Sequence, residues 1–408
     1  MKLLLLSGYG IKISVSDSKL HIQDGHDMNR PEPSNYVFKP KFIDYDNIVL
    51  YGHSGNITLD AIKWLTKQNI QLSILNWNGK LLTTILPVES KQSITRIAQY
   101  KAYQNSEQRV EIAKKFIDAK IKNSVAVLRW LGERYPHIAK QNEKHKQSIQ
   151  YNWSLISKAK SVSEIMGLEG RVANSYWKII SSTFDNKFEF IARKYGKTPS
   201  PRGAVDPINA LFNYGYSILE SHCRKAVNSN GLDQYIGFLH EMNPSKIPLV
   251  YDLQEPFRWI VDIAVITSLE KKIFSKKDFI RTENYNLRIR PNGVKKLMNE
   301  LNKVFSSTVE YNKQRWEWNH IIVEKANELA MYLTNRKKNI DFSTPAPNLK
   351  REDSNTLRKQ ILAIPYKDAK KLGFSKGTLW YMKQNAKNDK PFKVYEKVKK
   401  KLESRDTK

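Results

Sequence analysis

The chain has 408 residues, more than a single core of about 250–300 residues accommodates, so two or three domains are expected. Hydrophobic residues make up 40% of the sequence, which excludes general disorder, and the one cysteine, Cys223, excludes an intrachain disulfide and fits a reducing cytoplasm. The formal net charge of +29 favours a nucleic-acid partner over the alternative that the basic surface only keeps the protein soluble. An anionic membrane is disfavoured, because neither a basic amphipathic helix nor a lipid anchor is found.

The first ninety residues are predicted to be mostly β-strand. Residues 11–22 alternate apolar and polar side chains about a turn at Asp17-Ser18, and residues 72–86 form a second hairpin signature about Asn78-Gly79. Between them Thr58 is placed to cap a helix, whose buried face is predicted to hold Leu59, Ile62 and Leu65. The apolar run at the start is too short for a signal peptide, and no later stretch has the length of a membrane span, so a cytoplasmic protein is expected.

From about residue 93 to 339 the hydrophobic period becomes helical. A long helix is predicted through residues 112–131, where apolar side chains recur at i, i+3 and i+4. Further helices are predicted around residues 171–194, 206–228, 255–270 and 311–336. The expected fold is therefore α+β, with an N-terminal β-sheet domain over residues 1–88 and an all-α domain over residues 93–340.

A short basic module is predicted at the C-terminus, over residues 345–408. The stretch from Thr344 to Lys408 carries 18 Lys and Arg against 7 Asp and Glu, and it opens with a proline-containing linker. Within it, YKDAKKLGFSKGTLWYMKQN is typical of a helix-turn-helix, with Gly373 at the turn and Ser375 capping the second helix. Its charge favours DNA contact over a helical hairpin packed on the main domain. The side chains predicted to contact DNA are Ser375, Lys376, Thr378 and Lys383.

Acidic residues and a histidine in the helical region are candidates for metal ligands. Glu169 lies in GLEGRVANSYW, His240 in GFLHEMNPSKIPLVYD, and Asp252 and Glu255 in YDLQEPFRWIVD. Oxygen and imidazole donors without cysteine suit Mn²⁺ or Mg²⁺ rather than structural zinc. Such an ion would orient phosphate oxygens and polarise a nucleophilic hydroxyl.

Each candidate also has a structural interpretation. Glu169 would be a first-turn helix acid, and His240 a histidine satisfied in the core. Asp252 and Glu255 have the spacing of a capping box, which Pro256 in the first turn supports. Spacing alone does not select the metal site over these alternatives.

Three stretches resemble the CRISPR-associated integrase family, also described as metal-dependent DNA endonucleases. They are SGNITLDAIKWLTKQNIQLSIL, PRGAVDPINALFNYGYSILES and LVYDLQEPFR, and the resemblance runs to about residue 305. It implies an N-terminal β-domain that mediates dimerisation and a helical catalytic domain. It also implies that Glu169, His240 and Glu255 hold the metal, with Asp252 in a supporting role.

The added C-terminal module resembles casposases, transposon-encoded relatives that insert their own DNA ends without the small CRISPR partner protein. This resemblance implies a DNA integrase that joins 3′-OH ends to double-stranded target DNA by transesterification. Nearby Arg171, Arg202 and Arg258 are expected to grip phosphates. Two alternatives stay open: a CRISPR adaptation integrase that works with a partner protein, and a non-catalytic architectural DNA-binding protein.

Overall fold

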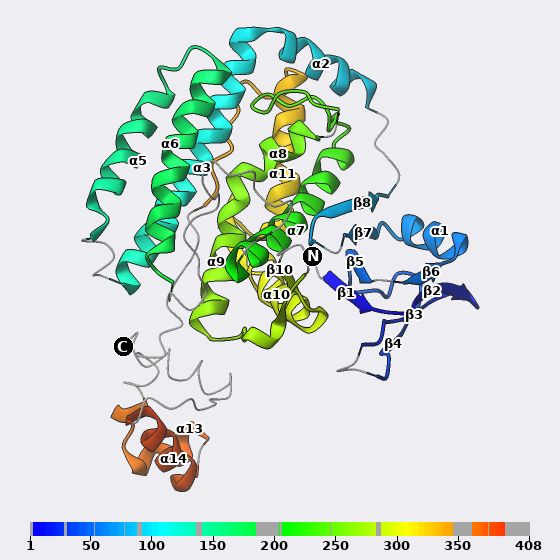
Figure 1. Cartoon of the computed structure of the whole chain (residues 1–408), viewed down its shortest axis with the longest axis vertical. Helices are drawn as coiled ribbons and strands as arrows, with labels where there is room; N and C mark the ends of the chain where they lie inside the picture. The colour runs from blue at the N-terminus through cyan, green and yellow to red at the C-terminus, as the bar shows by residue number, and fades with distance from the viewer. Residues whose placement is uncertain are drawn as a thin grey trace. The chain divides into compact units, whose positions relative to one another are not determined.

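In the computed structural model the chain divides into two compact units, Met1–Pro347 and Asn348–Lys408. The fold is α+β, with N-terminal sheets followed by a helical region (Figure 1). The residues that the structure describes are 3–27, 31–52, 54–76, 78–87, 92–135, 141–184, 204, 206–244, 246–282, 287–345, 361–373 and 375–387. Among these residues, no helix is long and apolar enough to cross a membrane.

Two four-stranded sheets make up the N-terminal region. The first has the order β1 (Leu3–Gly8), β5 (Asn47–Gly52), β7 (Gln71–Leu75) and β8 (Leu81–Ile85); its first three strands are parallel and β8 is antiparallel. The second has the order β4 (Asn35–Phe38), β3 (Lys19–Gln23), β2 (Ile11–Ser16) and β6 (Gly55–Ile57). Apolar side chains of both sheets and of the intervening helix share one core.

Both predicted hairpins are confirmed. Strands β2 and β3 pair antiparallel across Asp17 and Ser18, whose φ angles of 47° and 61° suit a tight turn that matches the twist of the strands. Strands β7 and β8 pair across the Asn-Gly turn, where Gly79 has a φ of 79°. The parallel pairing of β1 with β5 was not predicted, because alternation within a strand does not reveal its partner.

The predicted N-terminal helix is present, but its buried face differs from the prediction. Helix α1 spans Leu59–Lys67, and Thr58 caps it by accepting from the Ala61 amide, as predicted. Leu59, however, is 74% exposed. The buried residues are Ala61, Trp64 and Leu65, because the Trp64 indole packs inward and donates to the Ser18 carbonyl at 3.0 Å.

The described part of the helical region contains long helices and two small hairpins. Its elements are α2 (Ser93–Gln104), α3 (Ser106–Arg134), α5 (Glu143–Ile156), α6 (Val162–Ser181), α7 (Pro207–Ser229), α8 (Pro248–Gln254), η2 (Glu255–Phe257), α9 (Arg258–Glu270), η3 (Lys276–Asp278), β9 (Phe279–Arg281), β10 (Leu287–Ile289), α10 (Pro291–Phe305), β11 (Thr308–Tyr311), β12 (Gln314–Glu317) and α11 (Trp318–Leu333). The predicted helix at 311–336 is wrong at its start, because residues 308–317 form the hairpin β11–β12. The prediction for 171–194 extends beyond α6 into residues outside the described set.

Helix α7 is the central element and is buried along most of its length, including Cys223. It packs on α8, α9 and α11 and also on strands β7 and β8 of the N-terminal sheet. Buried polar contacts reinforce this junction: Asn47 donates to the Ser221 hydroxyl at 3.2 Å, and Gln71 donates to the Ser221 carbonyl at 2.9 Å. The sheets and the helices therefore belong to one compact unit.

In the second unit the described residues, 361–373 and 375–387, are mainly helical. It includes η4 (Tyr366–Asp368), α13 (Ala369–Leu372) and α14 (Lys376–Lys387) around a core of Ile361, Ile364, Ala369, Leu372, Leu379 and Met382. Gly373 ends α13 with a φ of 89°, and the Ser375 hydroxyl accepts from the Thr378 amide at 3.0 Å. The predicted turn and cap are confirmed.

Candidate active site

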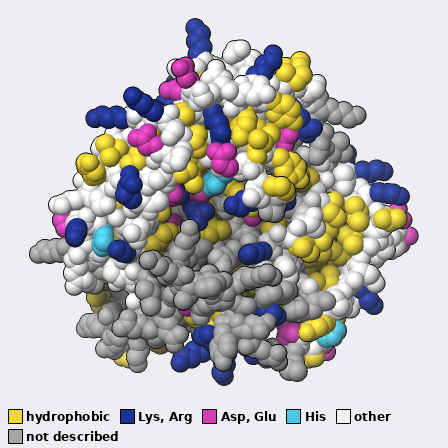
Figure 2. All heavy atoms as spheres, turned by 45° about the horizontal axis from the view of Figure 1, so that its top comes forward, with side chains coloured by type: hydrophobic (Ala, Val, Ile, Leu, Met, Phe, Trp, Pro, Cys, Tyr) yellow, Lys and Arg dark blue, Asp and Glu magenta, His cyan; other side chains and the backbone are white. Residues whose placement is uncertain are grey.

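A pocket of about 550 Å³ opens between α3, α6, the loop that follows α7, and the start of α9. Glu169, His240 and Glu255 all line it, although they come from three separate parts of the chain. Its other lining side chains include Lys120, Tyr176 and Arg258. On the face of the molecule drawn in Figure 2, Lys and Arg side chains are widely spread, with Asp and Glu side chains among them.

Glu169 projects from the middle of α6. The helix begins at Val162 with Ser161 as its cap, so Glu169 lies two turns inside it. The interpretation of Glu169 as a first-turn acid is therefore wrong. Its carboxylate Oε1 lies 2.5 Å from the ammonium Nζ of Lys120 on α3.

His240 lies in the irregular segment between α7 and α8. Its side chain is 26% exposed and lines the pocket, so it is not a fully enclosed core histidine. The ring Nδ1 is 2.7 Å from Oδ1 of Asp252, which leaves Nε2 as the nitrogen available to a ligand. Burial lowers the pKa of His240, but the hydrogen bond and charge of Asp252 outweigh it, so the pKa lies above its ordinary value.

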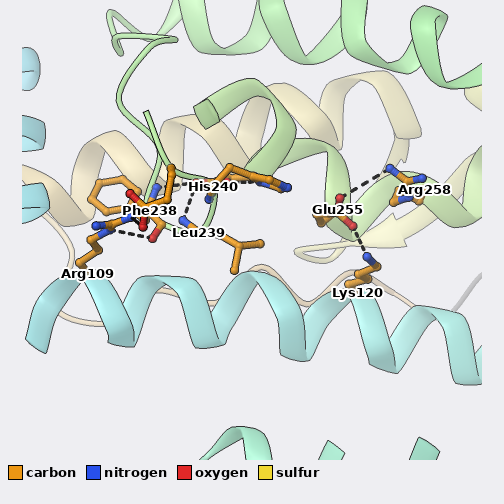
Figure 3. A network of polar contacts seen from close by, with 9 residues as sticks. Arg109, Lys120, Phe238, Leu239, His240, Glu255 and Arg258 are labelled. Carbon is orange, nitrogen blue, oxygen red and sulfur yellow. Dashed lines mark hydrogen bonds and ion pairs between the residues drawn. The ribbon is translucent and has the colours of Figure 1, made fainter. Parts of the chain in front are cut away.

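Asp252 is fully buried and organises the segment that carries His240. One of its oxygens accepts from the amides of Phe238 and Leu239 at 2.5 and 2.9 Å, and the other accepts from the His240 amide at 3.0 Å. Arg109 of α3 holds the same segment from outside, through the Phe238 carbonyl and the Glu241 carboxylate (Figure 3). Backbone and ring of His240 are thus fixed together.

The capping-box interpretation of Asp252 and Glu255 is also wrong. Asp252 lies inside α8, which begins at Pro248, and its carboxylate is directed to the loop rather than to a helix start. Glu255 begins the 3₁₀ turn between α8 and α9 and is buried beside Lys120 and Arg258. Burial raises the pKa of Glu255, but the charges of these two cations and of His240 outweigh it and hold the pKa below its ordinary value.

Lys120 connects the two glutamates. Its Nζ lies 2.5 Å from Glu169 Oε1 and 2.5 Å from Glu255 Oε2, and Figure 3 shows it rising from α3 toward Glu255. Burial lowers the pKa of Lys120, but the charges of Glu255 and Glu169 raise it above its ordinary value. The ammonium is therefore held in its charged form between the two carboxylates.

Arg258 is held by a second set of contacts. Its guanidinium lies 3.5 Å from Glu255 Oε1 and 4.0 Å above the ring centroid of Tyr216. The hydroxyls of Tyr216 and Tyr176 donate to the buried carboxylate of Asp262 at 2.5 and 2.7 Å. Arg258 therefore lies in the pocket wall, as a predicted phosphate contact would require.

The other predicted DNA contacts are distributed differently. Arg171 is exposed but donates to Asn152 on α5 at 2.7 Å and does not line the pocket, and Arg202 lies outside the described residues. In the C-terminal unit Lys376 is exposed, whereas the Ser375 and Thr378 hydroxyls contact each other at the helix start. Lys383 is turned inward, with Nζ donating to the Leu362 carbonyl at 2.8 Å.

Two carboxylates and an imidazole are the donor types that Mn²⁺ or Mg²⁺ takes. Within the described residues no three His, Cys, Asp or Glu side chains are arranged to hold a metal ion as they stand. The position between Glu169 and Glu255 nevertheless holds a positive charge, the Lys120 ammonium. The donor set thus fits a cation.

Sequence reasoning missed Lys120 and Arg109, although both face the site from α3. Each is one of many basic residues in a chain with 69 Lys and Arg, and its helical position alone does not distinguish it. The available signal was the apolar stripe of the helix. Lys120 lies between the buried Ala119 and Ile121, where a lysine requires a partner.

Comparisons with known proteins agree with this architecture. The family model of the CRISPR-associated protein Cas1 matches residues 4–303. A CRISPR-associated endonuclease Cas1 from Archaeoglobus fulgidus is 28% identical over 82% of this chain and 97% of its own length, and one from Francisella tularensis subsp. novicida is 27% identical over 81% and 95%.

Solved structures of a casposase and of a Cas1 protein are similar to this chain as well. A casposase bound to integration product is 48% identical, with a TM-score of 0.82 over 90% of this chain and 100% of that chain. A Cas1 protein from Thermotoga maritima is 18% identical, with a TM-score of 0.64 over 81% of this chain and 97% of its own, and it shares the fold.

Proposed function

This chain belongs to the Cas1 family, and on that premise we propose that it is a casposase, an integrase that joins the 3′-OH ends of its own element to target DNA. The observation that carries the proposal is the 48% identity to a casposase over the whole of that chain. The pocket that gathers Glu169, His240 and Glu255 supplies a site for the chemistry.

We assign Glu169, Glu255 and Nε2 of His240 as ligands of one Mn²⁺ or Mg²⁺. When bound, the ion would polarise the phosphate and the attacking hydroxyl. Asp252 acts as a positioning residue, because it holds Nδ1 of His240 and the backbone that carries it. Arg258 lies in the pocket wall, where its guanidinium would pair with a phosphate oxygen and stabilise the negative charge on that oxygen during the reaction.

The reaction is a single transesterification. The 3′-oxygen forms a bond to the target phosphorus as the bond to the leaving 3′-oxygen of the target strand breaks. The attacking hydroxyl loses its proton to solvent, and the leaving oxygen takes one up from solvent to become a new 3′-OH. No protein nucleophile is needed. The contribution of the chain is to position the strands and to stabilise charge in a partly buried pocket.

We assign DNA-end recognition to the C-terminal unit. Helix α14 exposes Lys376, Trp380 and Tyr381, and a helix with such a face fits a major groove. The unit Asn348–Lys408 carries 18 Lys and Arg against 7 Asp and Glu, which suits a polyanion.

The N-terminal sheets are proposed to form a homodimer. Val37 and Leu82 are exposed on their strands, and hydrophobic side chains gather on the right of Figure 2, the side on which Figure 1 places these strands. Two DNA ends are joined in one event, which a two-fold assembly suits. Sedimentation of the DNA-free protein at micromolar concentration should show a dimer, and a monomer alone would contradict the assignment.

The Cas1 relatives support a second candidate, an integrase of CRISPR adaptation that works with a partner protein. Strand transfer measured with purified protein, Mn²⁺ and a pre-cut DNA end separates the two. A casposase should form the joined product without any added protein, and the product should vanish in chelator while DNA binding persists. Activity only with an added partner would favour the CRISPR function, and DNA binding without activity in any condition would indicate an architectural protein.

A further inference from the structure

Lys120 is placed where a metal ion would be expected. It projects from α3 into the pocket and contacts one oxygen of each glutamate, at 2.5 Å in both cases. Its side chain is only 17% exposed. A buried ammonium is costly unless it is paired, and two neighbouring carboxylates repel each other unless a cation separates them. Each group therefore stabilises the other.

The ammonium and a divalent ion would both be drawn to the oxygens that Lys120 now contacts. A divalent ion bound to both carboxylates would lie about 2.1 Å from their oxygens, and therefore within a few ångström of the ammonium. Like charges at that separation repel strongly in a partly buried pocket. Ammonium and metal thus compete for one position.

Arg258 does not share this competition. Its guanidinium lies 3.5 Å from the other oxygen of Glu255 and is stacked on the Tyr216 ring. Among the residues that the structure describes, no aromatic ring stacks on the Lys120 ammonium, and the side chain is a flexible four-carbon stem. The pocket of about 550 Å³ offers space for that stem to swing aside.

We propose that the Lys120 ammonium holds the place of the divalent cation, keeping Glu169 and Glu255 together before the metal binds, and that it must be displaced when the metal binds. The inference rests on the proposed function, because it takes this pocket as the metal site. Metal binding to the DNA-free protein then includes the free energy of displacing the ammonium. The observed affinity for the metal is therefore lower than the affinity that the carboxylates and the imidazole would have without Lys120.

The test is Mn²⁺ binding to the DNA-free protein by titration calorimetry, together with thermal melting in chelator and in Mn²⁺. Lys120→Met removes the charge and keeps the length, and Lys120→Gln keeps a hydrogen-bonding group. Both should bind Mn²⁺ about tenfold more tightly than wild type, a gain of about 1.4 kcal/mol. In chelator both variants should melt at a lower temperature than wild type. Addition of Mn²⁺ should raise the melting temperature of each variant more than it raises that of wild type.

Lys115→Met is the matched control, because Lys115 lies on the same helix, is exposed and makes no contact with the glutamates. It should leave Mn²⁺ affinity unchanged. Equal or weaker Mn²⁺ binding by both Lys120 variants would overturn the inference. Failure of both to fold even in Mn²⁺ would overturn it as well, since the metal would then not replace the ammonium.

Glu255→Gln, titrated in parallel, separates this inference from the proposed function. If Glu255→Gln leaves wild-type Mn²⁺ binding intact, the metal site itself is misassigned. If Glu255→Gln abolishes binding but the Lys120 variants bind like wild type, the metal site stands and only the role of Lys120 is wrong.

Discussion

The pocket of the main unit and the outer face of α14 treat their functional side chains in opposite ways. In the pocket, Lys120 and Glu255 are enclosed, and each has an opposite charge at hand. On α14, Trp380 and Tyr381 are 55% and 59% exposed, and Lys376 also faces solvent. Chemistry on a phosphate needs charges that are already fixed and partly dry, whereas recognition of a groove needs side chains that reach outward. Substitutions should therefore separate catalysis from selectivity.

The largest effect is expected from His240→Ala. It removes the only imidazole of the proposed ligand set, so strand transfer should be abolished while DNA binding stays near wild type. The ring is partly exposed and its main contact is with Asp252, so the fold should survive. The measurements are product formation and thermal melting on one preparation, with His320→Ala, an exposed histidine on α11, as control. Near-normal product formation would contradict the assignment of His240 as a metal ligand. If the variant also lost about 1–3 kcal/mol of stability, His240 would be a structural histidine.

Asp252→Asn is expected to have the next largest effect. Substitution of a residue that orients a metal-binding histidine typically lowers metal affinity or activity by about 10–100-fold. An amide oxygen can replace only one side of a carboxylate that accepts from three backbone amides and the His240 ring. Activity at saturating Mn²⁺ should recover further in Asp252→Asn than in His240→Ala, because the variant keeps the ligand and loses only its positioning. Equal, unrecoverable losses would place Asp252 among the reacting groups.

The contrast between the two regions also explains what the sequence could predict. The turn at Gly373 and the cap at Ser375 depend on neighbouring residues, so local rules found them. In the pocket Lys120 and Glu255 lie 135 positions apart, and nothing local links them. The proposed ligand residues were predicted from a family resemblance. Lys120 was predicted neither by that resemblance nor by local rules. The capping-box interpretation failed because Asp252 is bonded to the amides of the preceding loop, 12 to 14 positions upstream, and not to a helix start three positions away.

Deletion of Asn348–Lys408 should affect selectivity more than chemistry. The remaining Met1–Pro347 unit keeps the pocket and a net charge of about +18, so its affinity for random duplex should survive. Affinity for the cognate ends of the element should fall by about tenfold or more, since each lost base contact is worth about 1–3 kcal/mol. Binding isotherms at one fixed salt concentration, with cognate and scrambled ends, decide. Equal losses on both DNAs would make the unit an electrostatic clamp and would favour the CRISPR alternative.

The smallest effect is expected from two substitutions within α14, Lys376→Ala and Ser375→Ala. Lys376 is exposed, so its loss should weaken DNA binding modestly and leave melting unchanged. The Ser375 hydroxyl accepts from the Thr378 amide, so its loss should cost the unit about 1 kcal/mol of stability, as for other helix caps. Any effect of Ser375→Ala on DNA should then disappear on cooling, because the helix refolds, whereas that of Lys376→Ala should persist. If Ser375→Ala instead weakened binding with no change in melting, Ser375 would be a direct DNA contact, and α14 would use its first turn as well as its outer face.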